Sequence, residues 1–199
     1  MEKYLLAPLL IRKLEKDDDF RIGFSRLLKA LAVACAVAAV IVFFLGWKDL
    51  FDMSSEGMIG GIIYQLSFAI ASYFVVHCTL IRAGEIKQAA SGGSAAVLVS
   101  SVVLKLAGEA WGIASALLGC GAAVYLWFAG REARVLLDKT AVFFPFLKAG
   151  PASFAAGMAL IFQGILYGAL AILIGYLLAE MLRLLPVRSG AKEAVLEKG

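Results

Sequence analysis

The chain has 199 residues, of which 62% are hydrophobic and 17% are charged, and its formal net charge is +4. Soluble domains usually carry about a quarter charged residues. The composition therefore excludes an ordinary soluble domain and indicates an integral membrane protein.

Four stretches contain no Asp, Glu, Lys or Arg: residues 30–47, 58–81, 110–130 and 154–179, with lengths of 18, 24, 21 and 26 residues. A helix rises about 1.5 Å per residue, so about 20 residues cross a hydrocarbon core about 30 Å thick. None of the stretches alternates apolar with polar residues as barrel strands do. We predict an all-α integral membrane protein, a four-helix bundle with transmembrane helices at about 27–47, 58–82, 110–130 and 154–180.

The polar ends of the chain are expected to flank this transmembrane domain, which covers residues 27–182. In the leader, residues 1–26, Pro8 suits a first helical position, and leucines and Ile11 interleave with Arg12 and Lys13. This pattern predicts an amphipathic inner-surface helix, which either lies on anionic lipid or packs on the bundle. Residues 183–199 form a polar tail.

The distribution of Lys and Arg predicts the orientation. Residues 1–29, 82–109 and 183–199 carry 14 of these residues, and the opposite side carries five. Since cytoplasmic segments are enriched in Lys and Arg, both termini are expected in the cytoplasm, and the membrane is expected to be a bacterial inner membrane. Topology accounts for the net charge, so no nucleic-acid partner is predicted.

The loop between the third and fourth helices, residues 131–153, mixes charges with Phe143, Phe144 and Phe146. Pro145 and Pro151 interrupt any helix there. We expect a short segment lying along the outer surface, or a docking surface for a partner; the sequence does not choose between them.

Glu109 directly precedes the third uncharged stretch, and Lys105 lies about one turn before Glu109. Counting about 20 residues back from Arg131 places the inner membrane boundary near Trp111, so we expect an i,i+4 ion pair at the inner mouth of this helix. An ion pair at mid-membrane would be the functional alternative. Residues 88–104 are expected to form a surface helix or a re-entrant segment.

The two halves of the chain share a weak pattern. "RLLKALAVACAV" and "VVLKLAGEAWGI" both begin an apolar run with Leu-Lys, and the second and fourth helices both end near an acid and an Arg. This pattern predicts a possible 2+2 internal repeat, as some transporters have.

Few polar side chains fall inside the predicted spans. The candidate intramembrane polar contacts are Gln65, His77, Gln163 and Tyr167. Buried amides in membranes commonly join helices through hydrogen bonds; alternatively, Gln65 and Gln163 line one solute path. His77 either relays protons or is a neutral hydrogen-bonded residue.

Close helix packing is predicted from small residues at four-residue spacing. The candidates are Ala30, Ala34 and Ala38 in the first span, Gly108, Gly112 and Ala116 in the third, and Gly164 and Gly168 in the fourth. This spacing does not tell whether the contacts lie within one chain or between chains.

Sequence motifs for catalysis, cofactors and metals are missing: there is no HExxH, Walker A loop or GxSxG elbow, and a single histidine and three dispersed cysteines do not predict a metal site. We therefore expect a non-catalytic accessory or structural component that contacts the lipid bilayer and packs against other membrane subunits or itself. A small-solute or ion transporter or channel acting as an oligomer is the alternative, and a lipid-modifying enzyme ranks below both.

Overall fold

The computed structural model describes residues 17–88, 95–148 and 150–196. Every regular element in these ranges is helical: α2 (Asp17–Leu50), α3 (Ser55–Gln88), α4 (Ala95–Ala129), η2 (Gly130–Ala133), α5 (Arg134–Ala141), η3 (Pro145–Leu147) and α6 (Phe154–Leu196). Four helices, within α2, α3, α4–α5 and α6, are long and apolar enough to cross a membrane. The predicted fold class is confirmed to this extent.

The helices extend beyond the predicted spans at their polar ends. The predicted inner-surface helix falls largely in residues 1–16, outside the described residues, and from Asp17 onward the leader belongs to α2. The segment at 88–104 is also part of long helices, because α3 ends at Gln88 and α4 begins at Ala95. The described part of that segment is therefore neither a separate surface helix nor re-entrant, and residues 89–94 lie outside the description.

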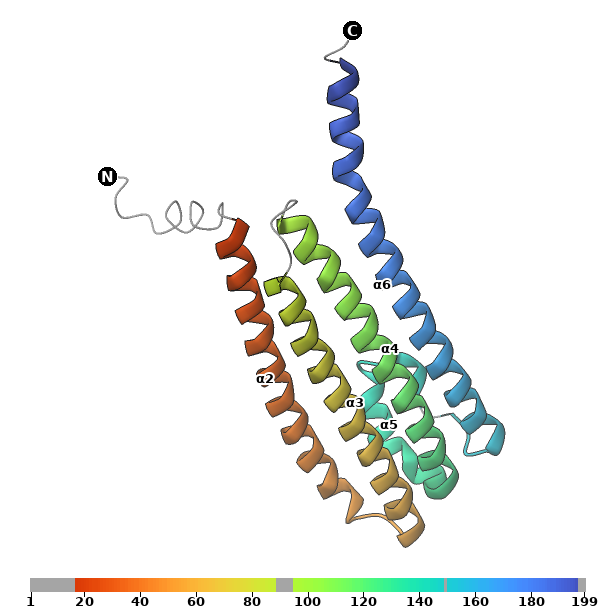
Figure 1. Cartoon of the computed structure of the whole chain (residues 1–199). Helices are drawn as coiled ribbons and strands as arrows, with labels where there is room; N and C mark the ends of the chain where they lie inside the picture. Colours follow the sequence, from red (N-terminus) through yellow and green to blue (C-terminus); the bar gives the residue numbers. More distant parts are fainter. Residues whose placement is uncertain (1–16, 89–94, 149, 197–199) are drawn as a thin grey trace, which may run out of the picture.

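The four long helices lie in a row in chain order, and consecutive helices run in opposite directions (Figure 1). The main contacts are those of α2 with α3, of α3 with α4, and of α4 with α6. The four helices of the predicted bundle therefore form one open layer. The two helices inside the row are more buried than the two at its edges. The buried share of the most apolar stretch is 61% in α4 and 28% in α3, against 22% in α6 and 11% in α2.

Glycines allow α4 and α6 to approach closely. A β-carbon at Gly108 would lie 3.2 Å from the Cα of Gly175, and one at Gly119 would lie 2.9 Å from the Cα of Gly164. The backbones are therefore in direct contact, a form of packing that suits helices in lipid. Because α4 packs on α3 as well as on α6, it is the most buried helix.

The segment after α4 does not lie along the outer end of the layer, so that expectation was wrong. Gly130 turns the chain with a φ of 55°, a conformation that glycine adopts at no steric cost. From there α5 and η3 run back beside α4 (Figure 1). The ring of Phe144 packs on that of Trp111 with centroids 4.8 Å apart. Trp111 is 18 residues from the end of α4, which corresponds to about 27 Å of helix.

The folded-back segment, residues 134–148, buries its apolar side. Leu136, Leu137 and Leu147 are buried, and Phe146 packs on Tyr167 of α6 with centroids 5.5 Å apart. Its charged part stays near the turn, where Lys139 Nζ lies 2.6 Å from Asp49 Oδ2 of α2. The tip of the segment, residues 140–147, has no charge. It buries Leu147 and part of Phe144 and Phe146 against the helices, which is favourable, while Val142 and Phe143 remain exposed.

Candidate functional site

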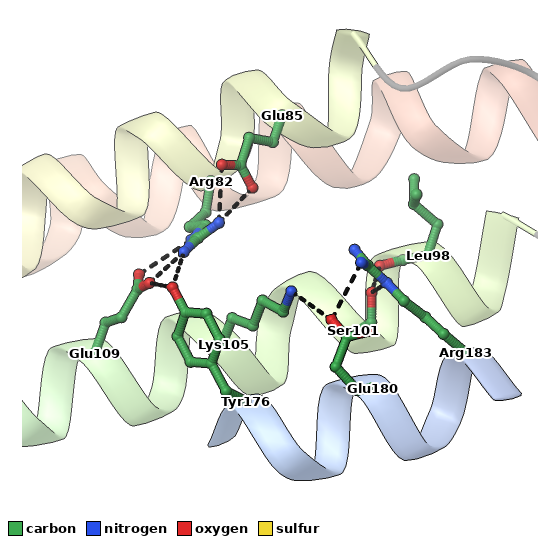
Figure 2. A network of polar contacts seen from close by, with 9 residues as sticks. All are labelled: Arg82, Glu85, Leu98, Ser101, Lys105, Glu109, Tyr176, Glu180 and Arg183. Atoms are coloured by element: carbon green, nitrogen blue, oxygen red, sulfur yellow. Dashed lines mark hydrogen bonds and ion pairs between the residues drawn. The ribbon is translucent and has the colours of Figure 1, made fainter. Parts of the chain in front are cut away.

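The densest group of polar contacts lies where the C-terminal end of α3, the N-terminal half of α4 and the C-terminal half of α6 meet (Figure 2). We call it the inner polar network. Its members are Arg82, Glu85, Ser101, Lys105, Glu109, Tyr176, Glu180 and Arg183.

Arg82 of α3 is the centre of the network. Its Nε donates to Glu109 Oε2 at 3.0 Å, and its Nη2 donates to Glu109 Oε1. Its Nη1 donates to both carboxylate oxygens of Glu85, at 2.8 and 2.6 Å. The side chains of Arg82 and Glu109 are only 13% and 16% exposed. A two-point Arg–carboxylate contact of this kind fixes orientation as well as charge, so it aligns α3 with α4.

Tyr176 connects α6 to this pair. Its hydroxyl donates to Glu109 Oε1 at 2.6 Å and accepts from Arg82 Nη2 at 2.9 Å. One phenol therefore contacts both members of an ion pair that belongs to two other helices. The three long helices are joined at a single point.

The expected direct pair between Lys105 and Glu109 is replaced by two pairs with other helices. Glu109 pairs with Arg82, and Lys105 Nζ lies 2.9 Å from Glu180 Oε1 of α6. The Lys105 ammonium also lies 5.0 Å from the ring centre of Tyr176. The four-residue spacing along one helix predicted a contact between Lys105 and Glu109. Charged side chains of α3 and α6 lie within reach, however, and each of the two residues forms its ion pair with one of them.

Arg183 extends the network along α6. Its Nη1 donates to Glu180 Oε1 at 3.3 Å, and its Nε donates to the hydroxyl of Ser101 at 3.3 Å. Ser101 is completely buried and donates in turn to the Leu98 carbonyl at 2.9 Å. This second branch ties α6 to the N-terminal part of α4.

The network is electrically balanced. Three cations, Arg82, Lys105 and Arg183, face three carboxylates, Glu85, Glu109 and Glu180. Each charge has an ion partner, so the arrangement is suited to holding helices together. In the described parts of the chain, no group of three or more His, Cys, Asp or Glu side chains is placed to hold a metal ion.

The four candidate intramembrane polar residues do not meet. Gln65 is 6% exposed and lies against Gly46, in the contact between α2 and α3. Gln163 and Tyr167 are exposed on α6, a helix that packs mainly on α4. His77 is exposed and stacks on Tyr73 with ring centroids 5.8 Å apart. Gln65 and Gln163 therefore do not line one path within this chain.

The candidate packing residues divide into two groups. Gly108, Gly112, Gly164 and Gly168 form the contact of α4 with α6, and Ala116 beside them is half-buried. In contrast, the ladder of α2 is exposed along its whole length: Ala30, Ala34 and Ala38. The α2 side that packs on α3 carries other residues, such as Leu28, Ala32 and Leu50.

Two features escaped the sequence reasoning. The glycine contact continues to Gly119 and Gly175, which lie seven residues after Gly112 and Gly168, so a search at heptad spacing would have found them. The folded-back segment was missed because its charges suggested an outer loop. The signal was its uncharged tip of eight residues, 140–147, which is too short to span a bilayer but apolar enough to be buried.

No protein-family model, no curated protein and no solved structure matches the chain.

Proposed function

We propose that the chain is an integral membrane protein whose four long helices cross the bilayer. Support comes from the length and hydropathy of these helices and from their exposed apolar side chains. The end of the layer that carries the inner polar network is assigned to the cytoplasm, because the parts of the sequence that precede, join or follow the helices at that end, residues 1–29, 82–109 and 183–199, contain 14 of the 19 Lys and Arg residues. Both termini are then cytoplasmic, and a bacterial inner membrane is the proposed location.

Within that membrane, the proposed role is a non-catalytic accessory or structural component that packs against other membrane subunits or further copies of itself. The observation that carries this proposal is the exposed small-residue ladder of α2, Ala30, Ala34 and Ala38. Small residues let a helix from another chain approach closely. The corresponding ladders of α4 and α6 are already used within the chain, whereas the ladder of α2 is not.

The polar groups support the same role. The charges of the inner polar network are paired with one another, and the buried amide of Gln65 lies in a helix contact. Polar residues used in this way join helices. A catalytic site would instead present a group poised to react in a pocket.

Gentle extraction from the native membrane, followed by mass measurement of the intact assembly, tests the proposal. Foreign subunits or further copies at fixed stoichiometry are expected. A chain extracted as a lipid-bound monomer under conditions that preserve other membrane complexes would refute it. Failure to sediment with membranes after alkaline carbonate washing would refute membrane insertion itself.

A small-solute or ion transporter or channel is the second candidate, and the folded-back segment favours it. Non-helical backbone at membrane depth occurs where it is buried in protein or lines a water-filled cavity, as in channels and transporters. Since the described helices form an open layer, any path would be enclosed by an oligomer. Flux through proteoliposomes that is lost in Gln65→Leu while the protein still inserts would support this function; Gln163→Leu is the matched variant at an exposed position.

A further inference from the structure

An apolar groove runs between the C-terminal half of α2 and the middle of α3. Its volume is about 430 Å³, and its walls include Ala36, Val40 and Phe43 of α2 and Ala69, Tyr73 and Val76 of α3. A second cavity of about 190 Å³ shares Ala39, Phe68, Ser72 and Val76 with it. Ligand sites in proteins commonly have volumes of about 300–1,000 Å³, so the groove is large enough for part of a small amphiphile.

The groove exists because α2 and α3 touch at both ends and separate between them. At one end the Ser25 hydroxyl donates to the Ala83 carbonyl at 2.7 Å. At the other end Gly46 lies against Gln65, and Leu50 lies against Gly61. Between these contacts the walls include small side chains, such as Ala36 and Ala69. They are too short to fill the space, so the two helices leave it open.

Two lysines flank the Ser25–Ala83 contact at the cytoplasmic end of the groove, one on each helix: Lys29 four residues from Ser25 on the groove side, and Lys87 four residues from Ala83 on the far side. Lys29 precedes Ala36 by seven residues, and Lys87 follows Val76 by 11. Seven and 11 residues are close to two and three whole turns, so each lysine lies on the helix face that lines the groove. Both are exposed, and within the described residues neither has an ion pair.

We propose that this groove binds an anionic phospholipid of the cytoplasmic leaflet, with an acyl chain between α2 and α3 and the phosphate at Lys29 and Lys87. The inference rests on the proposed membrane insertion. The distance along α2 from Ala36 to Lys29 is about 10 Å, which leaves room for the glycerol backbone between chain and phosphate. Lysines at a cytoplasmic membrane surface attract anionic headgroups, and an apolar wall favours the acyl chain.

The lysines beside the groove argue for an anionic lipid and against a partner helix. A helix is about 10–12 Å across, so a groove of 430 Å³ takes up only single side chains of a helix, and these leave the two lysines without an anionic partner. An acyl chain is narrow and flexible. The exposed ladder of α2 is separate from the groove, since Ala30, Ala34 and Ala38 are not among its lining residues, so lipid binding and subunit assembly can occur together.

The test is native mass spectrometry of the full-length protein from micelles that contain equal amounts of phosphatidylglycerol and phosphatidylcholine. Wild-type protein is expected to retain one phosphatidylglycerol in preference to phosphatidylcholine. Lys29→Gln combined with Lys87→Gln is expected to lower this retention about tenfold. The control with the same charge change is Lys48→Gln combined with Arg131→Gln, at the opposite end of the layer, and it should retain the lipid as wild type does.

Ala36→Phe tests the apolar part separately, because it fills the groove and leaves both lysines in place. It is expected to abolish retention of phosphatidylglycerol, and its melting temperature in detergent shows whether the variant still folds. Equal retention of both lipids by the wild type, or equal losses in the two double variants, would overturn the proposal. Failure of membrane insertion is read independently by flotation with liposomes, so it refutes the proposed function and is not mistaken for loss of the lipid site.

Discussion

Gly112 of α4 and Gly168 of α6 face each other so closely that a β-carbon on Gly112 would lie 2.7 Å from the Gly168 carbonyl oxygen. Gly164 and Gly175 make similar approaches to α4 along the same line. The contact between the two helices is therefore backbone on backbone. Any side chain larger than hydrogen must push the helices apart.

Gly112→Val is expected to destabilise the protein by about 1–3 kcal/mol, the usual cost of overpacking a close contact. Equilibrium unfolding in mixed micelles measures the change. Gly23→Ala is the control, because a β-carbon there meets nothing within 4 Å, and alanine is the better helix former. Equal stability of Gly112→Val and wild type would show that α4 and α6 do not pack as described.

The ion pair between Arg82 and Glu109 is expected to contribute more than the exposed pair of Lys139 with Asp49. Partly buried, doubly hydrogen-bonded pairs couple strongly, and a double-mutant cycle of Arg82→Gln and Glu109→Gln should give about 1–2 kcal/mol. The Lys139 side chain is 63% exposed, so the cycle of Lys139→Gln and Asp49→Asn should give less than about 1 kcal/mol. Equal coupling energies in the two cycles would contradict the central position of Arg82.

Because the folded-back segment runs beside α4, a cysteine introduced at its tip is expected to be protected from water-soluble reagents. In a chain whose natural cysteines are replaced by alanine, Phe144→Cys is expected to resist a membrane-impermeant maleimide, and Phe51→Cys is expected to react. Phe51 is 71% exposed at the end of α2. In addition, Phe144→Cys and Trp111→Cys together should cross-link with a short reagent, because the native rings are 4.8 Å apart.

A segment lying along the outer surface would leave Phe144→Cys unprotected. Both single cysteines would then react at similar rates, and the double variant would not cross-link. The arrangement of residues 134–148 described here would be wrong in that case.

Ala34→Phe is expected to disrupt assembly with neighbouring subunits without changing the fold of the chain. Ala34 lies in the exposed ladder of α2, so the larger ring has space within one chain but blocks a close helix–helix approach. The mass of the extracted assembly should fall, while the unfolding transition of the purified chain stays unchanged. Val42→Phe, at another exposed position of α2, is the control and should leave the mass as it is; a wild-type mass for Ala34→Phe would exclude the ladder as a contact.

Local chemistry was enough to predict the four long helices and part of their packing. Charge-free runs of 18–26 residues leave few alternatives to long apolar helices, and Gly164 and Gly168 at four-residue spacing marked one side of the α4–α6 contact correctly. The same reasoning does not distinguish the small-residue ladders of α4 and α6, which pack within the chain, from the exposed ladder of α2. The spacing of Ala30 and Ala34 resembles that of the glycines, yet α2 turns this face away from α3.

The sequence by itself determined which segments form long apolar helices and where their charges lie, because both follow from short-range periodicity and hydropathy. Only the tertiary structure decided the partners: Arg82 for Glu109, Glu180 for Lys105, and Trp111 for Phe144. These pairs join residues 27, 75 and 33 positions apart in the chain. Their contacts depend on the order and rotation of the packed helices, and that packing is decided by long-range burial and close approach, which no local pattern encodes.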